Sequence, residues 1–405
     1  MAVPNILLLG FTVPDPVARK LFALDPSPAV QTHKFAWSLA RTLQHGFGKL
    51  VLASACPIQN YPTARRVFFQ GGRFDVGGTQ GVFLGFVNLL VLKHLTRFAA
   101  CLLTLPRLLR SQRVDWLFVH GIHTPFLLFG ILARLTGRKL AVVLTDPPGV
   151  VLATDSRIAR ALKRLDVWLV SRALRHADAV IALAPELVRR LAIAKPALVF
   201  PGILDSSLVA DGAVNRFCAE STGTFTIVYA GGLNRAYGVD RLLDAILGID
   251  DVPVRLKLFG RGDQESRIRD LAASDSRIEY GGFVGNEVLQ PELHAADLLI
   301  NPRPTEEAFA AMSFPSKLIE YLATGRPILT TRIVSIPENY QPYFNFIDDE
   351  SAFGIRRAVL DMIRMPADQR DLQGLYGQKF IYNEASEAAV GSKIVQFIQY
   401  VSSLR

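Results

Sequence analysis

Cysteine is scarce in this sequence, and the few cysteines are scattered. The chain of 405 residues has three of them, Cys56, Cys101 and Cys218. Their spacing fits neither a zinc or redox motif nor a set of disulfides, so we expect small buried apolar residues in a reducing cytosol. The sequence also lacks an Asp-x-Asp pair and a set of His and Cys residues with the spacing of a known metal motif. We therefore predict no metal site, no bound cofactor and no disulfide scaffold.

Long uninterrupted apolar runs are also lacking. No stretch reaches the roughly 18 uncharged apolar residues that a membrane-spanning helix needs. Residues 1–10 are apolar but lack the basic region and the cleavage site of a signal peptide, so we predict a first strand there. We accordingly expect a cytoplasmic protein, with peripheral attachment to the inner face of the membrane left open.

Acidic residues are fewer than basic ones. The chain has 36 Asp and Glu against 45 Lys and Arg, which gives a formal net charge of +9. Nucleic acid, an anionic membrane surface and phosphorylated small molecules all suit such a balance. We expect no nucleic-acid partner, because the sequence has no recognition-helix, zinc-finger or RRM pattern.

Half of the residues are apolar, and they recur in two kinds of segment. Short runs rich in β-branched residues and leucine alternate with stretches of helical period, which predicts parallel βαβ units. The predicted strands of the first half are Asn5–Gly10, Lys49–Ala53, Trp116–His120, Leu140–Thr145, Ala179–Ala182 and Leu198–Pro201. Its predicted helices include Thr32–His45, Phe126–Leu135, Arg157–Leu174 and Pro185–Ala192.

A loop of small, polar and turn-forming residues, about 202–223, interrupts the alternation and is predicted to link two domains. The alternation restarts at Thr226–Ala230, and the chain ends in an amphipathic helix, Ala385–Leu404. The predicted fold class is α/β, with two Rossmann-like domains facing across a cleft. We place these domains at 1–205 and 206–384, and the helix that packs toward the first domain at 385–405.

The stretch Val82–Leu105 does not fit a plain doubly wound domain. It is dense in Phe, Leu and Val, and residues 76–114 contain five Lys or Arg but no Asp or Glu. One interpretation is an interfacial helix, in which apolar side chains such as Phe86 enter a bilayer while Lys93 and Arg97 face anionic head groups. A core helix with a solvated basic edge fits the pattern equally well.

The most informative stretch is Ser313–Pro327, with the sequence SFPSKLIEYLATGRP. Pro315 suits the first turn of a helix, and Lys317 and Glu320, three residues apart, share one face of it. The positive helix end, with Ser316 and the Lys317 ammonium, can bind a diphosphate, and the Glu320 carboxylate can accept hydrogen bonds from a ribose. The block predicts a nucleoside diphosphate site. An ordinary surface helix with an ion pair is the alternative.

Three glycine motifs precede this block, each directly after a predicted strand. Glycines at the carboxyl end of a strand let backbone N–H groups approach a phosphate closely, and exposed backbone at a strand end can bind a planar base. Each motif alone fits a tight turn, but their order in one Rossmann half favours a site for a nucleoside diphosphate. The motifs supply the candidate residues Gly231, Gly232, Arg235, Gly260, Arg261, Phe283 and Val284.

In this order, residues 231–238, 260–262, 282–284 and 314–327 resemble the donor-binding half of glycosyltransferase family 4. That family has the GT-B fold, and its retaining members use nucleotide sugars as co-substrates. The resemblance implies a metal-independent enzyme that transfers a sugar from a nucleotide sugar with retention of configuration. We expect the acceptor to be a lipid-linked glycan or polysaccharide intermediate, which would bring the protein to an anionic membrane surface.

Two departures from the family pattern bear on the site. The Arg and Lys that family members often carry after the first strand of the second domain are Gly232 and Tyr237 here, so Arg235 or Lys317 has to supply the charge. The first Glu of the family's E-x7-E pattern falls on Met312. A branch of the family resembles this chain in having the Phe-Pro-Ser-Lys block instead.

The resemblance also places a functional histidine at His120, and we assign the catalytic roles to His120 and Lys317. Same-face displacement is implied, in which positive groups neutralise the leaving diphosphate and its oxygen helps to deprotonate the acceptor. Acceptor binding is expected at the carboxyl ends of the first-domain strands, with His33, Lys34 and Asp146 as candidates. A structural hydrogen bond remains the alternative for each histidine.

Two other functions stay open. A nucleotide-sugar epimerase of the same fold would bind the same nucleotide but would need no acceptor. A non-catalytic partner subunit with a degenerate donor site is compatible with the missing Arg, Lys and Glu. A Rossmann oxidoreductase is disfavoured, because no G-x-G-x-x-G follows the first predicted strand.

Overall fold

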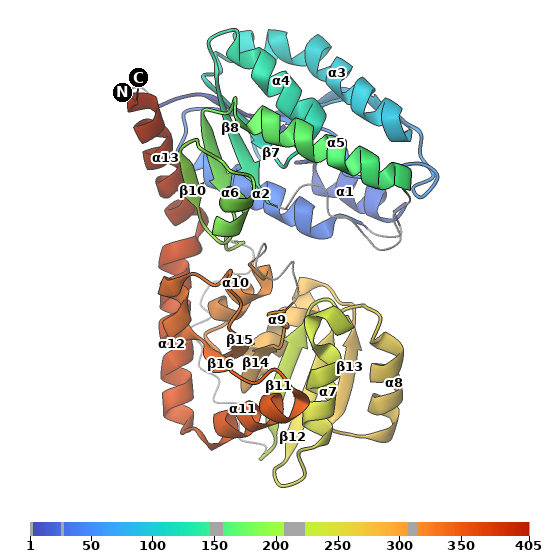
Figure 1. The fold of residues 1–405 in the computed structure, drawn as a ribbon, viewed down its shortest axis with the longest axis vertical. Helices are drawn as coiled ribbons and strands as arrows, with labels where there is room; N and C mark the ends of the chain where they lie inside the picture. Colours follow the sequence, from blue (N-terminus) through green and yellow to red (C-terminus); the bar gives the residue numbers. More distant parts are fainter. Residues whose placement is uncertain (1–2, 26–27, 146–156, 206–222, 307–313, 405) are drawn as a thin grey trace. The chain divides into compact units, whose positions relative to one another are not determined.

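The computed structural model describes residues 3–25, 28–145, 157–205, 223–306 and 314–404, and the chain forms two compact units (Figure 1). The first unit comprises Met1–Ile203 together with Glu387–Arg405, and the second comprises Leu204–Ser386. Each unit has a mainly or wholly parallel sheet with helices on both faces. The predicted fold class, α/β with two Rossmann-like domains, is confirmed. Cys218 and most of the predicted interdomain loop lie outside the described residues.

The first unit is built on an eight-stranded sheet of order β10-β9-β8-β7-β1-β2-β5-β4. Its strands are parallel except β4, which pairs antiparallel with β5 at one edge. Strands β1, β2 and β7 are buried along their whole length, so their sequences are continuous apolar runs. The bounds are β1 (Ile6–Gly10), β2 (Leu50–Ser54), β4 (Gly72–Val76), β5 (Thr79–Phe83), β7 (Trp116–His120), β8 (Lys139–Leu144), β9 (Ala179–Ala182) and β10 (Ala197–Val199).

Alternate residues of β1 point to opposite faces of this sheet. Leu7 and Leu9 join the core under α3, α4 and α5, whereas Ile6 and Leu8 join the core under α2 and α13. This division follows from the period of two along a strand. The helices of the first unit are α1 (Asp15–Phe22), α2 (Val30–Gln44), α3 (Leu90–Ser111), α4 (Thr124–Arg134), α5 (Arg157–Leu174), α6 (Pro185–Arg190) and α13 (Glu387–Ser403).

The C-terminal helix α13 belongs to the first unit, where it packs on α2. The Arg41 Nε donates to the buried carboxylate of Glu387 at 2.7 Å. Gly391 approaches α2 so closely that an added Cβ would stand 2.8 Å from the Thr42 carbonyl oxygen. The sequence predicts one helix over 385–404. In the structure the preceding helix ends at Ala385 and α13 begins at Glu387, because Ser386 is extended, with ψ 153°.

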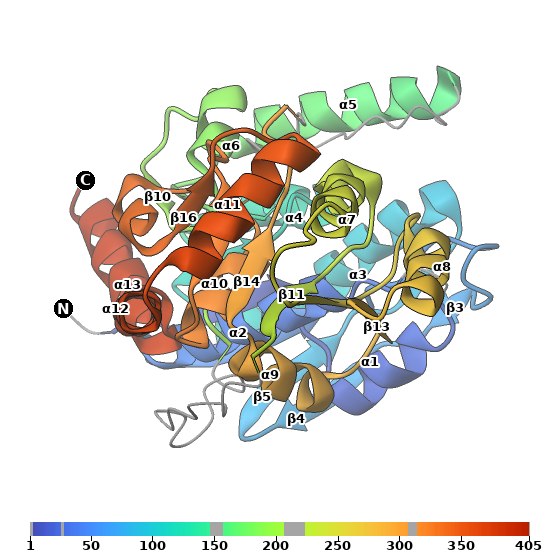
Figure 2. The ribbon, with the colours of Figure 1, turned by 90° about the horizontal axis from the view of Figure 1, so that it is seen from below.

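The second unit has a six-stranded, wholly parallel sheet of order β13-β12-β11-β14-β15-β16 (Figure 2). Helices α7, α8 and α11 cover one face of it, and α9, α10 and α12 cover the other. The strands are β11 (Phe225–Ala230), β12 (Val254–Phe259), β13 (Ile278–Gly282), β14 (Leu298–Asn301), β15 (Ile328–Thr331) and β16 (Asn345–Ile347). The helices are α7 (Val239–Leu247), α8 (Glu265–Ser274), α9 (Asn286–Ala295), α10 (Ser316–Ala323), α11 (Ala352–Arg364) and α12 (Ala367–Ala385).

Both interpretations of Val82–Leu105 are wrong in detail. The stretch contains the end of β5, the short strand β6 (Phe86–Val87) and the first part of α3 rather than one helix. Lys93 and Arg97 point inward, with 6% and 2% of their surface exposed, and Phe86 is buried as well. These two basic side chains are therefore neither solvated nor directed at head groups.

Polar groups at the carboxyl edge of the first sheet explain why Lys93 and Arg97 point inward. The Lys93 ammonium donates to the Ile58 carbonyl and to the Asn60 side chain, at 2.5 and 3.1 Å. The Arg97 guanidinium donates to the Cys56 carbonyl at 2.9 Å and lies 4.2 Å from the centre of the Phe86 ring. A buried cation is retained only where such partners replace water. Among the described residues, no helix is both long and apolar enough to cross a membrane.

Candidate functional site

The strand order of the second unit creates a topological switch point between β11 and β14. Numbered along the chain, its strands lie in the order 3-2-1-4-5-6, so the connections leave the first and fourth strands toward opposite faces. The crevice outside the carboxyl ends of these two strands is where ligands bind in open α/β sheets. Gly231 follows β11 here, and Pro302 and Arg303 follow β14.

The glycine loops at this edge lie directly against one another. The Gly231 N–H donates to the Phe259 carbonyl at 2.9 Å, and the Leu233 N–H donates to the Arg261 carbonyl at 2.8 Å. Gly231 has φ +149° and Gly260 has φ +136°, and an added Cβ on Gly260 would collide with the Gly231 carbonyl. Contact between loops is thus enough to require glycine at position 260.

Lys317 lies in the first turn of α10, next to the Gly231 loop. Its ammonium donates to the Tyr229 hydroxyl at 3.0 Å and lies 4.0 Å from the centre of that ring. An added Cβ on Gly231 would collide with the Lys317 ammonium. Removal from water, and then the charge of Arg303, lower the pKa of Lys317 to about 7, against the opposing effect of Glu320. An anion at this point would favour the charged amine, so the position suits a phosphate.

Arg303 is a site residue that sequence reasoning missed. It lies two residues after the end of β14 and is 7% exposed, and its guanidinium lies 5.7 Å from the centre of the Tyr237 ring. The Lys317 ammonium lies 6.0 Å from the centre of the same ring, so the two cations are neighbours. A like charge nearby disfavours the protonated form of Lys317, and a bound anion would favour it. The Arg at the end of a strand that borders the switch point is the signal that could have revealed it.

Helix α10 is held to the end of β11 by Tyr321. The Ala230 N–H donates to the Tyr321 hydroxyl at 2.8 Å, and that hydroxyl donates to the Ala230 carbonyl at 3.2 Å. This pair fixes the distance between the glycine loop and the helix. Ser316 is exposed at the start of α10, and Glu320 is half-buried one turn beyond it. The predicted order along the helix, diphosphate and then ribose, is compatible with these positions.

Arg235, predicted to supply charge, is placed differently from Lys317. It lies in the short 3-10 turn Arg235–Tyr237, its side chain is 79% exposed, and its Nε is 3.1 Å from the Asp240 carboxylate. Its charge is therefore already compensated. The Arg261 guanidinium lies 4.9 Å from the centre of the Phe283 ring, which is 61% exposed at the carboxyl end of β13, while Val284 packs against the core. Phe283 offers a planar apolar face, and Val284 does not.

His120 lies at the corresponding switch point of the first unit, at the end of β7 and beside β1. It is 1% exposed, its Cβ would stand 2.9 Å from a Cβ added to Gly10, and its Nδ1 has no hydrogen-bond partner among the described residues. Burial lowers its pKa to about 4, so the imidazole is neutral at neutral pH. A neutral imidazole can donate or accept one hydrogen bond at an incoming group.

The three acceptor candidates have different outcomes. His33 is buried, and its Nε2 lies 2.9 Å from the Asp15 carboxylate, so this histidine already has a structural partner. Lys34 is half-buried on α2. Asp146 lies outside the described residues, as do Met312 and Ser313. Among the residues that are described, no three or more His, Cys, Asp or Glu are grouped to hold a metal ion.

Comparison with known proteins agrees with this geometry. Residues 224–362 match the family model described as glycosyl transferases group 1. This range contains the switch point of the second unit, including Gly231, Arg303 and Lys317. No curated protein matches the sequence.

Solved structures resemble the chain over almost its whole length. A sucrose-phosphate synthase from Thermosynechococcus elongatus has 14% identity and a TM-score of 0.67, with 99% of this chain and 100% of that chain covered. The protein HepE from Anabaena, solved in complex with UDP, has 12% identity and a TM-score of 0.63, with 98% and 100% covered. A trehalose-6-phosphate synthase, studied for glycosyl transfer with retention, has 12% identity and a TM-score of 0.62, with 99% of each chain covered.

At these identities the structures show the fold alone, and that fold is GT-B, as the resemblance implied. Sugar transfer is the activity that the family match supports. This protein is thus a GT-B protein whose second unit resembles the glycosyl transferases of group 1 over residues 224–362.

Proposed function

We propose that the protein transfers a sugar from a nucleoside diphosphate sugar to a lipid-linked glycan or polysaccharide intermediate, with retention of configuration. The observation that carries the donor half of this proposal is the meeting of Gly231, Arg303 and Lys317 at one switch point. Two neighbouring cations beside an open glycine loop are suited to a diphosphate. HepE, which shares the fold, was solved with UDP.

In this proposal Lys317 and Arg303 together hold the diphosphate. They take the part that the family often gives to an Arg and a Lys in the loop after β11, where this chain has Gly232 and Tyr237. Tyr229 keeps the Lys317 ammonium in place by accepting its hydrogen bond. Glu320, one turn along α10, accepts hydrogen bonds from the ribose hydroxyls, and the base lies near the exposed ring of Phe283.

Catalysis in this scheme consists of positioning and of stabilising the leaving diphosphate. As the bond between sugar and phosphate breaks, negative charge grows on the phosphate oxygen, and the two cations oppose it. That oxygen then takes the proton of the acceptor hydroxyl on the same face of the sugar, which gives retention. The trehalose-6-phosphate synthase of the same fold was studied for transfer of this kind. Two cations can neutralise the diphosphate without a divalent ion.

The first unit binds the acceptor in this proposal, at the carboxyl edge of its sheet. His120, neutral and buried at the switch point, positions a hydroxyl through its unpartnered Nδ1. His33 is a weaker candidate than it was from the sequence, since Asp15 already occupies one of its nitrogens. A cytoplasmic enzyme with these properties would meet a lipid-linked acceptor at the inner face of the membrane.

Calorimetry with UDP, GDP and ADP tests the donor half of the proposal. We expect one nucleoside diphosphate to bind, to release heat and to raise the melting temperature, because a ligand at 100 times its Kd stabilises by about 2.7 kcal/mol. If none of the three binds at millimolar concentration, the donor site is wrong.

Product analysis with the matching nucleotide sugar separates the remaining activities. Transfer that depends on an added acceptor supports the proposal. Conversion of the sugar nucleotide without an acceptor would indicate an epimerase. Nucleotide binding without any turnover, over a range of acceptors, would indicate a non-catalytic partner subunit.

A further inference from the structure

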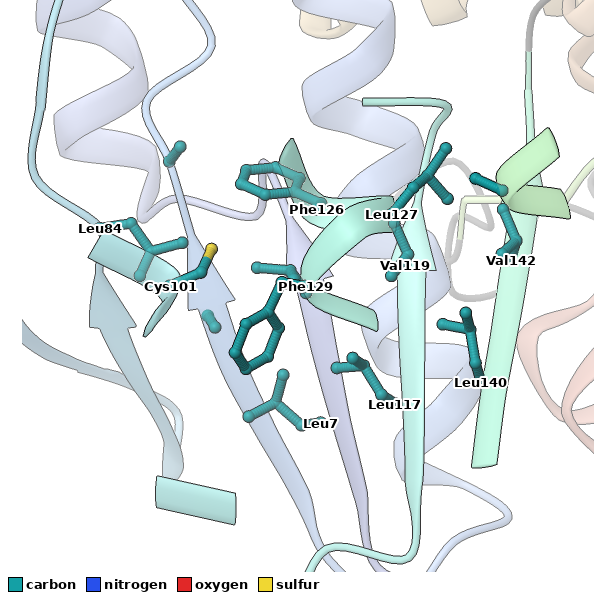
Figure 3. Packing of buried hydrophobic residues seen from close by; sticks show 14 of the residues in the cluster. Leu7, Leu84, Cys101, Leu117, Val119, Phe126, Leu127, Phe129, Leu140 and Val142 are labelled. Atoms are coloured by element: carbon teal, nitrogen blue, oxygen red, sulfur yellow. The ribbon is translucent and has the colours of Figure 1, made fainter. Parts of the chain in front are cut away.

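Three helices form one outer layer of the first unit. Helices α3, α4 and α5 lie over the same face of the sheet, with α4 in contact with both neighbours (Figure 1). Their inner faces are filled by the core. Figure 3 shows part of this packing, in which Cys101, Phe126 and Phe129 lie over Leu7 and Leu117. Any apolar side chain on the opposite face of these helices is therefore not part of that core.

The outer faces carry an unusual number of exposed large apolar side chains. On α3, Cys101, Leu105 and Leu109 are buried at intervals of four, while Leu95 and Leu103 are 61% and 76% exposed. Such residues recur at three- and four-residue intervals on each helix, so they form stripes directed away from the sheet. We define the outer apolar face by Leu95, Leu102, Leu103, Leu132, Leu135 and Trp168, all exposed.

The exposed charges on these three helices are mainly basic. Helices α3, α4 and α5 together contain ten Lys or Arg and one acidic residue, Asp166. The Thr124 hydroxyl donates to that carboxylate at 2.5 Å. Lys93 and Arg97 point inward, but Arg107 and Arg110 are exposed in the last turns of α3, next to its apolar stripe. Among the α5 side chains that the structure describes, the exposed basic residues are Arg160, Arg164 and Arg172.

We propose that this outer apolar face docks the first unit on an anionic lipid bilayer. Exposed leucines with an adjoining tryptophan gain by entering the interface, and arginines beside them meet anionic head groups. Charge complementarity decides between a bilayer and a second copy of the chain. A symmetric dimer through this face would bring the same arginines of both copies together, whereas anionic lipid compensates them. This proposal rests on the proposed function. Docking would bring the unit that binds the acceptor to the membrane that contains the lipid-linked acceptor.

This surface differs from the interfacial helix that the sequence suggests. Lys93, Arg97 and Phe86 belong to the interior of the unit, so they contribute nothing to docking. The docking residues come instead from three consecutive helices, α3, α4 and α5, which lie side by side over one face of the sheet. Attachment through them is peripheral, and it is expected to weaken as salt screens the arginines.

Co-sedimentation of the full chain with vesicles tests this surface. We expect binding to vesicles of phosphatidylcholine with phosphatidylglycerol at low salt, and its loss at high salt or with phosphatidylcholine alone. The double variant Leu102→Glu/Leu103→Glu should lower the partition coefficient by at least about tenfold, because it places two negative charges in the apolar stripe. Leu372→Glu, on α12 of the second unit and 49% exposed in the wild type, is the matched control and should bind like the wild type.

Arg107→Gln/Arg110→Gln provides a second variant that leaves the leucines intact. It should weaken binding to anionic vesicles and flatten the salt dependence. Unchanged binding in both double variants would overturn the proposal, as would equal binding to neutral vesicles. Sedimentation velocity without lipid tests whether a second copy of the chain binds this face. A dimer that dissociates in the Leu102→Glu/Leu103→Glu variant would show that a second copy covers the face.

Nucleotide affinity measured without vesicles keeps the two proposals apart. The α3 variants should bind nucleoside diphosphate as the wild type does, which also shows that they are folded. Loss of vesicle binding with intact nucleotide binding concerns only the docking surface. If vesicles bind as expected but no nucleotide does, the docking surface stands and the proposed function fails.

Discussion

The two units share the order of their central parallel strands but differ in the chemistry of their switch points. In the second unit the crevice between β11 and β14 holds an open glycine loop and the neighbouring cations Arg303 and Lys317. In the first unit the strands β1 and β7 border His120, which burial keeps neutral. The parallel sheet decides where a ligand can bind, and the few residues after two strands decide what it can be. A diphosphate suits the second switch point, and an uncharged hydroxyl suits the first.

The largest effect on this contrast is expected from Lys317→Ala. Loss of a charged partner from a buried hydrogen bond costs about 1.5–3 kcal/mol, so the affinity for nucleoside diphosphate should fall roughly ten- to a hundredfold. Calorimetry measures the change, and Lys379→Ala, an exposed lysine on α12, is the control. Glu320→Ala should fall in the lower part of the same range if Glu320 holds the ribose. Wild-type affinity in both folded site variants would remove α10 from the site.

The matched variants Arg303→Gln and Arg235→Gln test which of the two arginines binds the diphosphate. The first should weaken nucleotide binding by about tenfold, since it removes a buried charge beside Lys317. The second should change it by less than about twofold, since Arg235 is exposed and already paired with Asp240. The two dissociation constants, measured side by side, decide the matter. The reverse ranking would return the role to Arg235 and make Arg303 a structural residue.

Nucleotide affinity should depend on pH because of Lys317. Its pKa in the empty site is about 7, below the usual value, so the amine is mostly neutral above that pH. A diphosphate favours the charged amine and raises its pKa, so binding takes up a proton above pH 7. Affinity should therefore fall as pH rises beyond about 7, by up to roughly tenfold per pH unit.

Calorimetry in two buffers of different ionisation enthalpy counts the proton directly. Lys317→Met removes the titrating group and should abolish the dependence between pH 7 and 9 while binding more weakly at every pH. A variant that keeps the wild-type slope would assign the proton to another group.

His120→Gln should have the smallest effect on nucleotide binding, so it tests the switch point of the first unit separately from that of the second. The residue lies in the first unit, so we expect the Kd for nucleoside diphosphate to stay within about twofold of the wild type. Transfer to the acceptor should fall by about tenfold or more, because a positioned hydrogen bond at the reacting hydroxyl is lost. Steady-state rates and calorimetry on the same preparation check both expectations. Weakened nucleotide binding with normal turnover would reverse the assignment.

Much of the fold follows from local sequence. Strand Trp116–His120 and helix Arg157–Leu174 have the predicted bounds, because continuous apolar runs and amphipathic periods are recorded in neighbouring residues. Part of the candidate site could also be predicted from local sequence. Lys317 was found because it lies within a single helix start, whereas Arg303 becomes its neighbour only through the order of strands.

The sequence by itself determined the α/β class, two Rossmann-like domains and a candidate phosphate site at the start of α10, since each depends on residues close together in the chain. Tertiary structure decided which charges are buried. It turned Lys93 and Arg97 inward and Leu103 outward, because the carbonyls that receive the two cations come from the loop after β2. It also placed Arg303 beside Lys317. The free energy of a charged side chain depends on the groups that surround it in space, and the order of residues along the chain does not show which groups these are.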